Sequence, residues 1–268
     1  MVDLNAVNQG FSKKAEIYDA YCDAHPVIRW ARSVIRSEVL RCVPSAGSVL
    51  ELNAGTGSDA LFFVEHGLRV HATDVADGMV SAIDQKIRRA QAGTCFTAQQ
   101  LSFTDLHNVQ GAPFDLIFSN FGGLNCIADL KDVTRFLPSL LKPNGRVVWV
   151  VMPPVCPWEL TQALRGRFDV ARRRLHSNGV LANVEGAQVW TWYHTSRSVR
   201  SAFDSRFRLV NQRAISLFSP PSYMDRFPLL YPRLTNFLFE LDDHLGGLPP
   251  FNQWGDFVMY TFKYESAS

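Results

Sequence analysis

Residues 49–59 read VLELNAGTGSD, and this stretch decides the fold. An apolar strand that carries the acid Glu51 runs directly into the turn Asn53-Ala54-Gly55-Thr56-Gly57. Because glycine has no Cβ, Gly55 and Gly57 can adopt positive φ and let main-chain N–H groups approach a ligand at the start of the next helix. The stretch therefore predicts a strand, a tight turn and a helix that together bind a small charged cofactor.

The acid in the first strand helps to decide which cofactor this is. GTGSDA, residues 55–60, also satisfies the G-x-G-x-x-A pattern of dinucleotide sites, and Asp74 at the end of the next strand can hold a ribose in either case. In a dinucleotide site the glycines begin almost immediately after the strand, whereas here Glu51 precedes Gly55 by four residues. A carboxylate at this point repels a pyrophosphate but suits the ammonium and sulfonium groups of S-adenosylmethionine (SAM). The residues favour SAM over NAD.

Four ordered segments resemble the motifs of class I SAM-dependent methyltransferases. They are ELNAGTG (51–57), HATD (71–74), FDLIFSNFGGLN (114–125) and LKPNGRVV (141–148). The resemblance covers about residues 11–152 and departs from the family at Asn53, where the first glycine usually stands. Because Asn tolerates left-handed backbone geometry better than other non-glycine residues, we expect the turn to survive.

Strand-like and helix-like segments alternate along the chain, which is typical of parallel β-α-β units. Strands are expected at 48–52, 69–73, 95–100, 114–119 and 146–152, and helices at 11–23, 26–42, 57–66 and 130–141. Beyond residue 152 we expect a helix at 158–176, a strand at 188–194, a helix at 198–207, a strand at 208–218, a long helix at 223–245 and a strand at 255–264. This is an α/β, doubly wound, mostly parallel sheet with helices on both faces. The resemblance implies seven strands in the order 3-2-1-4-5-7-6.

Composition bounds the organisation and the partners. With 268 residues, 47% hydrophobic and 19% charged, the chain can build one large α/β core with a lid. We divide it into N-terminal cap helices (1–45) and a methyltransferase domain (46–268) with lid insertions at about 155–195 and 219–250. The net charge of +2 is too mild to indicate a nucleic-acid or anionic membrane partner. We interpret the arginine run 172–174, with Arg165 and Arg167 before it, as a solvated helix face.

Cysteine usage and the N-terminus indicate the compartment. The five cysteines are scattered, with no C-x-x-C pair and no metal-binding spacing, so we expect free thiols and no metal site. The first 21 residues lack the apolar core of a signal peptide, and no stretch reaches the roughly 18 apolar residues of a membrane span. We expect a cytoplasmic protein.

The resemblance assigns cofactor contacts residue by residue. Asp74 is expected to accept hydrogen bonds from both ribose hydroxyls; its alternative role is an N-cap for the following helix, with Asp77 as competitor. Val75 and Met79 line the adenine side or belong to the ordinary core. The predicted cofactor-binding residues are Tyr18, Glu51, Asn53, Ala54, Gly55, Thr56, Gly57, Asp74, Val75, Met79, Leu101, Ser102 and Asn120.

Three of these assignments come with alternatives or a stated location. The adenine contacts are placed at Gln100-Leu101-Ser102, with Asp105 as the alternative. The segment Ser119-Asn120-Phe121 follows the fourth strand, where ligands of open α/β sheets bind, and the resemblance places it beside the transferring methyl group. Tyr18 can hydrogen-bond the methionine carboxylate or simply pack its ring.

Methyl transfer from a sulfonium needs alignment and a dry pocket more than a catalytic side chain. A general base is required only for a neutral alcohol or a carbon centre. We predict His194 as the catalytic candidate, with His25 as a second, although a structural role is the common one for a lone histidine among aromatics. Eight aromatic residues after residue 152 are expected to be core or, collectively, to enclose an apolar, ring-binding pocket. They are Trp158, Trp190, Trp192, Tyr193, Tyr223, Phe237, Phe239 and Trp254.

The sequence argues against a nucleic-acid substrate. Enzymes that methylate an exocyclic amine of a flipped base typically carry N/D-P-P-Y/F after the fourth strand, whereas this chain has SNFGG there. The predicted function is SAM-dependent methyl transfer to an O, N or C nucleophile of a small, aromatic or apolar metabolite, with no nucleic-acid or membrane partner. Two alternatives remain: a SAM-binding protein that transfers no methyl group, and a NAD-dependent oxidoreductase.

Overall fold

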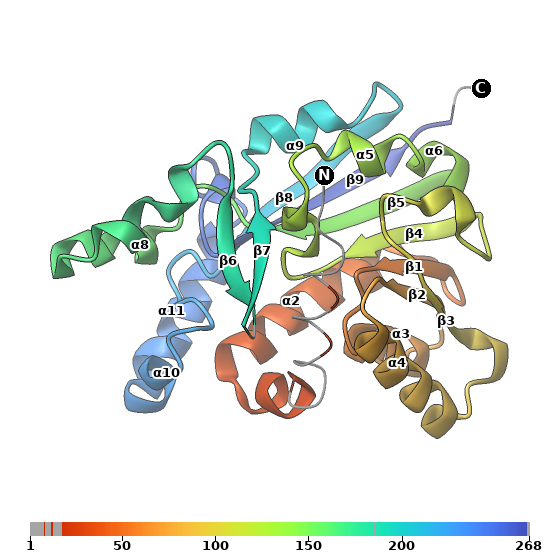
Figure 1. Cartoon of the computed structure of the whole chain (residues 1–268), viewed down its shortest axis with the longest axis horizontal. Coiled ribbons are helices and arrows are strands. Elements are labelled where there is room, and N and C mark those ends of the chain that lie inside the picture. Colours follow the sequence, from red (N-terminus) through yellow and green to blue (C-terminus); the bar gives the residue numbers. More distant parts are fainter. Residues whose placement is uncertain (1–7, 9–11, 13–17, 185, 267–268) are drawn as a thin grey trace.

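A computed structural model describes residues 8, 12, 18–184 and 186–266. A single seven-stranded sheet runs through the molecule, and Figure 1 shows helices above and below it. Its strands are β1 (Ser48–Leu52), β2 (Arg69–Asp74), β3 (Phe96–Gln100), β4 (Phe114–Ser119), β5 (Leu141–Val151), β8 (Phe207–Ile215) and β9 (Phe257–Tyr264).

The strand order confirms the predicted topology. The sheet runs β3-β2-β1-β4-β5-β9-β8, which is 3-2-1-4-5-7-6 when only its own strands are counted. The first five strands are parallel, and β9 pairs antiparallel with both β5 and β8. From β1 the chain builds outward through β2 and β3, then returns to add β4 on the other side of β1. The carboxyl ends of β1 and β4 thus flank the switch point where open α/β sheets bind ligands.

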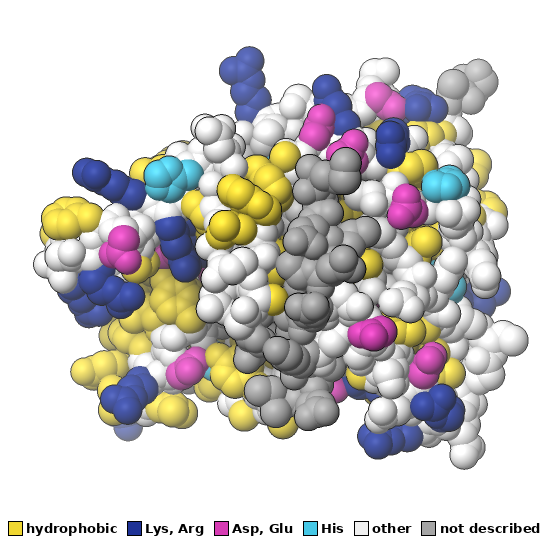
Figure 2. Space-filling view, in the orientation of Figure 1, with side chains coloured by type: hydrophobic (Ala, Val, Ile, Leu, Met, Phe, Trp, Pro, Cys, Tyr) yellow, Lys and Arg dark blue, Asp and Glu magenta, His cyan; other side chains and the backbone are white. Residues whose placement is uncertain are grey.

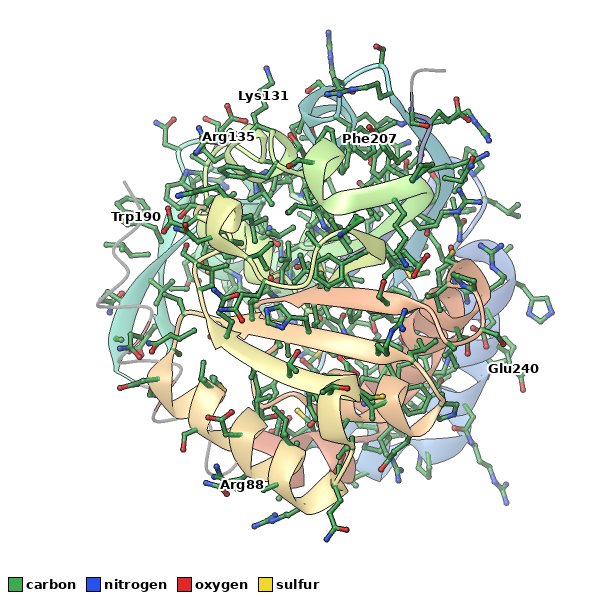
Figure 3. The ribbon with its side chains drawn as sticks, turned by 90° about the vertical axis from the view of Figure 1, so that its right-hand side faces the viewer. Arg88, Lys131, Arg135, Trp190, Phe207 and Glu240 are labelled. Atoms are coloured by element: carbon green, nitrogen blue, oxygen red, sulfur yellow. The ribbon has the colours of Figure 1, made fainter. Side chains whose placement is uncertain are left out.

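Two hydrophobic cores cover the two faces of the sheet. One packs α2 (Pro26–Cys42), α3 (Ser58–Glu65) and α4 (Asp77–Ala90) against one face through residues such as Ile35, Phe63 and Ile83. The other packs α5 (Lys131–Thr134), α6 (Leu137–Leu140) and α9 (Ser196–Ala202) on the opposite face. Figure 3 looks onto the β3 edge: Arg88 of α4 lies on one side of the sheet, and Lys131 and Arg135 on the other.

Three expected helices are divided into shorter ones in the structure. The expected helix 130–141 is split into α5 and α6, and 158–176 becomes α7 (Pro157–Leu160), η4 (Thr161–Arg165), α8 (Phe168–Arg172) and η5 (Arg173–Leu175). Gly166 interrupts the second at φ 75°. The expected helix 223–245 divides into α10 (Arg226–Leu230) and α11 (Pro232–Leu245), because Pro232 lacks the N–H that would continue α10. Apolar spacing therefore located helical segments but not their ends.

A two-stranded hairpin lies outside the main sheet. It pairs β6 (Val180–Val184) with β7 (Ala187–Thr191). The single strand expected at 188–194 is therefore wrong in extent, and the expectation did not include β6. Residues 18–24 are helical, while most of the expected helix at 11–23 lies outside the described residues. The division into cap, domain and lid stays a prediction. Among the described residues, no helix is both long and apolar enough to cross a bilayer.

Candidate functional site

The turn after β1 has the backbone geometry that its sequence predicts. Asn53, Gly55 and Gly57 have φ of 47°, 58° and 75°, so Asn53 does adopt the left-handed conformation expected of it. A Cβ on Gly57 would lie 2.9 Å from Ile83, which excludes any larger residue there without a shift of Ile83. A Cβ on Gly55 would meet no atom within 4 Å, so the turn presents an open face at this point.

The N–H groups of Gly55 and Gly57 are engaged within the protein. The Gly55 N–H donates to Asp74 Oδ2 at 2.9 Å, and the Gly57 N–H donates to the Ala54 carbonyl at 3.0 Å. The turn is also fixed to β2, because the Ala54 N–H donates to the Thr73 carbonyl at 2.9 Å. A ligand therefore meets a preformed turn whose open side is Gly55.

Asn53 joins the turn to the loop after β4. Its Oδ1 accepts a hydrogen bond from Ser119 Oγ at 2.8 Å, and its Nδ2 donates to the Asn120 carbonyl at 3.3 Å. Gly123 presses on the same amide, since a Cβ there would lie 2.1 Å from Asn53 Nδ2. The residue that departs from the family's usual glycine thus holds the two loops of the site together.

Asp74 ends β2 as a buried carboxylate, 8% exposed. Its two oxygens accept the N–H groups of Gly55 and Ala76, both at 2.9 Å. Burial raises the pKa of Asp74 to about 6, against the hydrogen bonds from these N–H groups. The N-cap residue of α4 is Ala76, whose side chain makes no capping hydrogen bond, so neither Asp74 nor Asp77 is its N-cap. The contact of Asp74 with a ribose stays a prediction.

Glu51 is buried in β1 with one oxygen unsatisfied. It is 2% exposed, and its Oε2 has no hydrogen-bond partner among the described residues. Burial is the largest cause that raises the pKa of Glu51 well above its usual value, followed by the nearby Asp59 carboxylate. A buried acid without a partner destabilises the ligand-free protein, and a cationic or hydrogen-bond-donating ligand removes this cost by supplying the missing partner.

Sequence reasoning missed a charged group beside Glu51. Arg36 Nε donates to Asp59 Oδ1 at 2.7 Å, and Asn120 Nδ2 donates to Asp59 Oδ2 at 2.8 Å. Arg32, from the same helix α2, is 6% exposed; its Nε lies 3.7 Å from Asp59 and has no hydrogen-bond partner among the described residues. The four-residue spacing of Arg32 and Arg36 on one helix face was the available signal.

The N-terminal helix covers the turn through Asp19. This carboxylate accepts hydrogen bonds from the hydroxyls of Thr56 and Ser58 and pairs with Lys86 of α4. Lys86 Nζ also donates to the Thr56 carbonyl at 2.9 Å. Thr56, one of the predicted cofactor-binding residues, is only 1% exposed as a result.

The predicted adenine side lies along the β2–β3 edge. The Leu101 N–H donates to the Asp74 carbonyl at 2.9 Å, and Gln100 Nε2 donates to the Val75 carbonyl at 3.0 Å. Met79 is 2% exposed and belongs to the core, whereas Val75 is half-buried. The remaining candidates are occupied locally: Ser102 Oγ and Thr104 Oγ1 lie 2.7 Å apart, and the Asp105 N–H donates to the Ser102 carbonyl.

A cavity of about 160 Å³ lies between the N-terminal helices, the loop after β4 and the start of β9. Its walls include four aromatic rings, two serines and one carboxylate: Tyr18, Tyr21, Phe121, Phe257, Ser216, Ser222 and Asp256. The guanidinium of Arg32 lies 6.0 Å from the Tyr18 ring and 5.6 Å from the Phe121 ring, so the cavity borders the Arg32–Asp59 pair. A larger groove of about 350 Å³ is lined by Trp30, Glu38 and Arg213, among others, and by none of the predicted site residues.

The two histidine candidates lie apart from this cavity's lining. His194 is 4% exposed, and its backbone N–H donates to the Met152 carbonyl at 3.1 Å. The ring atom Nε2 has no hydrogen-bond partner among the described residues. Burial lowers the pKa of His194, so the ring is neutral near pH 7. His25 Nε2 lies 3.3 Å from Asp225 Oδ1, at the contact between the N-terminal helix and α10. The geometry does not bring His194 and His25 together.

The eight aromatic residues expected to form the pocket are distributed over the lid. None of them lines the 160 Å³ cavity in the described part of the chain. Trp158 packs edge-on to Phe227 with ring centroids 5.2 Å apart, and Phe239 stacks on Trp30 at 4.7 Å. Trp190 stacks on Trp192 at 5.7 Å. These four rings pack as a core role predicts, while a collective role in an acceptor pocket stays a prediction.

The prediction that residues 172–174 form a solvated helix face is wrong for Arg174. It is 4% exposed, and it donates to Glu159 Oε1 at 2.8 Å and to Asp256 Oδ1 at 2.6 Å. The Sγ of Cys156 and carboxylate oxygens of Glu159 and Asp256 lie within 4.8 Å of one another, a spacing that could suit a metal ion. The Arg174 guanidinium donates hydrogen bonds to both carboxylates, so an arginine, and not a metal ion, is the cation of this cluster. It fixes η5 to the residue before β9.

Comparison with known proteins supports the fold and the family. A family model described as a methyltransferase domain matches residues 50–147. The Bacillus subtilis protein YqeM, named as a methyltransferase without proven activity, is 27% identical over 83% of this chain and 81% of its own length.

Solved structures give the same result for the fold. The CcbJ methyltransferase of Streptomyces caelestis superposes with a TM-score of 0.60 at 16% identity, over 94% of this chain and 96% of its own. A 1,6-didemethyltoxoflavin N1-methyltransferase of Burkholderia thailandensis, solved with S-adenosylhomocysteine, gives 0.58 at 16% identity, over 98% and 88%. Residues 50–147 thus match a methyltransferase domain, and the chain as a whole shares its fold with solved methyltransferases, one of them crystallised with S-adenosylhomocysteine.

Proposed function

We propose that the chain methylates a small organic molecule that binds in the 160 Å³ cavity, with SAM held at the turn after β1. The observation that carries this proposal is a pair of buried groups of opposite kind, Glu51 Oε2 and Arg32 Nε, each without a hydrogen-bond partner among the described residues. The methionine part of SAM presents an ammonium and a carboxylate, which are the partners that these two groups lack. Bound SAM supplies an electrophilic methyl group on a sulfonium.

The residues of the chain divide the cofactor between them. Glu51 pairs with the ammonium, and Arg32, supported by Tyr18, holds the carboxylate, because a guanidinium is the stronger carboxylate ligand. Asp74 accepts the ribose hydroxyls and Leu101 and Ser102 border the adenine. Asn120 fixes Asp59 beside the methionine end, at 2.8 Å. Glu51, Asp74, Leu101, Ser102 and Asn120 were already predicted from the sequence, whereas Arg32 and Asp59 were not.

The acceptor lies where the cavity meets Phe121. The rings of Tyr18, Tyr21, Phe121 and Phe257 exclude water from an apolar acceptor, and Ser216, Ser222 and Asp256 offer polar contacts. The 1,6-didemethyltoxoflavin N1-methyltransferase acts on a compact molecule on the same fold, which is in keeping with a small acceptor here. Nucleic acid is no part of the proposal, and cytoplasmic residence is supported by five free cysteines.

The cavity favours a nucleophile that needs no strong base. Burial raises the pKa of Tyr21 to about 12, so its hydroxyl stays protonated near pH 7. Asp256 is already engaged by Arg174 at 2.6 Å. Methyl transfer can then proceed by alignment alone, provided that the acceptor arrives with a free lone pair, as an amine, a carboxylate or a phenolate does. His194 as general base is retained only for an acceptor that extends beyond this cavity.

Calorimetry with two ligands tests the cofactor assignment. Arg32→Met should weaken SAM binding about 10- to 100-fold, the value of a charged hydrogen bond. The control is Arg29→Met, an exposed arginine on the same helix, which should bind SAM like wild type. Decarboxylated SAM lacks the carboxylate, so wild type and Arg32→Met should bind it equally. A loss that is equal for both ligands would remove Arg32 from the carboxylate.

Methyl transfer itself needs a separate measurement. Methyl-labelled SAM incubated with the protein and a fractionated metabolite extract should transfer label to a small compound. The same fractions with Phe121→Ala should give slower transfer with SAM affinity retained. Label transfer to no compound, together with intact SAM binding, would favour the alternative of a SAM-binding protein without methyl transfer.

A further inference from the structure

The net charge of the chain conceals an uneven distribution. We define the lid tip as residues 157–176 and 226–237. It holds seven arginines and two acids, a balance of +5, whereas the whole chain has +2, so all other residues together carry −3. One of its two acids, Glu159, is buried against Arg173 and Arg174. The exposed surface of the lid tip is therefore strongly basic.

The two segments of the lid tip lie side by side. Trp158 of α7 packs against Phe227 of α10, with ring centroids 5.2 Å apart. The Arg173 guanidinium lies 5.8 Å from the Tyr223 ring, just before α10. In Figure 1, α8, α10 and α11 all lie at the same end of the molecule, on the left, far from α4.

Large apolar side chains project from this basic surface. Leu164, Leu229 and Leu230 are 89%, 71% and 67% exposed. Other exposed apolar residues of the lid tip are Leu160, Phe168, Leu175, Tyr231, Leu234 and Phe237. Figure 2 shows yellow and dark blue intermixed at the left end of the molecule, with little magenta. Such a concentration of exposed apolar residues marks an interaction surface.

The arginines of the lid tip are available to a partner. Five of them are exposed and form no ion pair with any other described residue: Arg165, Arg167, Arg172, Arg226 and Arg233. Asp169 is the only exposed acid in either segment. A partner must therefore be anionic, and a second copy of this surface is disfavoured because it would bring like charges together.

We propose that the lid tip docks this enzyme on an anionic lipid surface. This inference goes beyond the proposed function and does not depend on it. Basic residues around exposed Leu and Phe side chains are the composition of segments that lie in a membrane interface, with the apolar groups in the acyl boundary and the guanidinium groups at the phosphates. Leucine, six of the nine apolar residues, is under-represented among the residues that dominate protein–protein binding.

This docking places the acceptor cavity close to the lipid surface. Ser222, which lines the cavity, lies four residues before α10, and Tyr21, another lining residue, donates to Asp225 Oδ1 at 2.8 Å. Docking requires no membrane-spanning helix. It also explains why the sequence-wide charge led to the opposite expectation: the acidic remainder of the chain cancels a basic end.

Vesicle flotation of the full-length protein tests the proposal. The protein should float with vesicles of phosphatidylcholine and phosphatidylglycerol in equal parts and stay behind with phosphatidylcholine alone, and added salt should weaken the association. The double variant Leu164→Ser/Leu229→Ser should lower partitioning at least about tenfold. Its control, Leu248→Ser, changes a leucine that is 51% exposed outside the lid tip and should leave partitioning unchanged.

A charge pair completes the design. Arg165→Gln/Arg226→Gln should lower partitioning about 25-fold, at about fivefold per arginine. The matched control is Arg88→Gln/Arg89→Gln on α4, which removes the same charge from the other end of the molecule. Equal SAM affinity in all variants, measured by calorimetry, would show that each is folded.

Five results would overturn the proposal. Three concern the vesicles: no association with anionic vesicles, equal association with neutral vesicles, and equal loss in the control variants. Polyglutamate binding as tight as vesicle binding would reassign the lid tip to acidic macromolecules, and a dimer that Leu164→Ser dissociates would reassign it to self-association.

Discussion

The buried carboxylate of Asp74 makes a prediction about stability that can be worked out numerically. Its pKa of about 6 in the folded protein lies above the ordinary value of 3.8. Folding therefore disfavours its ionised form, and the associated stability is fully present below pH 3.8 and is lost as the pH rises through 6. Raising this pKa from 3.8 to about 6 costs about 3 kcal/mol of stability at pH 8.

Asp74→Asn removes the charge and keeps the shape. The amide can accept only one of the two N–H groups, from Gly55 and Ala76, that the carboxylate accepts. The lost hydrogen bond costs about 1 kcal/mol. The net effect at pH 8 is an increase of about 2 kcal/mol in the free energy of unfolding of the ligand-free protein. At pH 5 wild-type Asp74 is mostly protonated when folded, and the increase shrinks by about 1.4 kcal/mol.

Urea unfolding of the ligand-free protein at pH 5 and pH 8 measures both values by linear extrapolation. The control is Asp77→Asn, which alters an exposed carboxylate three residues away and should show no gain that grows with pH. Calorimetry at pH 8 should show that Asp74→Asn binds SAM about 10- to 100-fold more weakly, because a charged bidentate contact is lost. A difference in stability that is the same at both pH values would refute the argument that burial of this charge is costly.

Three further substitutions follow from the same geometry. Glu51→Gln should stabilise the ligand-free protein above pH 5, because the pKa of Glu51 is raised and its ionisation opposes folding. The same variant should bind SAM at least about tenfold more weakly, and tighter binding would contradict the ammonium contact. Because burial lowers the pKa of His194, wild type should lose stability relative to His194→Asn as the pH falls below 6.5. Thermal unfolding at pH 5.5 and 8 would measure this loss. Unchanged turnover of His194→Asn at all pH values would give this histidine a structural role only. Arg174→Met should lower the free energy of unfolding in urea by about 3–5 kcal/mol, because Glu159 and Asp256 lose their shared partner. A loss as small as that caused by replacing an exposed arginine would refute the stabilising role of this buried cluster.

The sequence predicted the parts of the site that are local in the chain. The turn at residues 53–57, the acid in β1 and the acid that ends β2 follow from composition and spacing within about 25 residues. Even the left-handed Asn53 follows from the known tolerance of asparagine. Strand order also followed, because the motifs of a recognised family occur in sequence order.

The parts that failed depend on distant segments. Arg174 was taken as solvated because its neighbours are arginines, but its burial depends on Asp256, which is 82 residues away. Arg32 gives no signal on its own, since its unsatisfied Nε becomes visible only when α2 packs beside Asp59. The density of aromatic residues did not distinguish a core from a pocket, and the stacking of Phe239 on Trp30 joins segments about 200 residues apart. Tertiary packing decides these cases, and the periodicity of one segment carries no information about it.

The close fit of Gly123 against the Asn53 amide has an evolutionary consequence. Since a Cβ at position 123 would overlap the side chain at position 53, the glycine is obligatory only while asparagine stands at the earlier position. Relatives that carry glycine at position 53 are released from this constraint and can accept alanine at position 123. The two positions are therefore expected to co-vary between lineages, and an ancestral exchange at one of them would have to precede the exchange at the other.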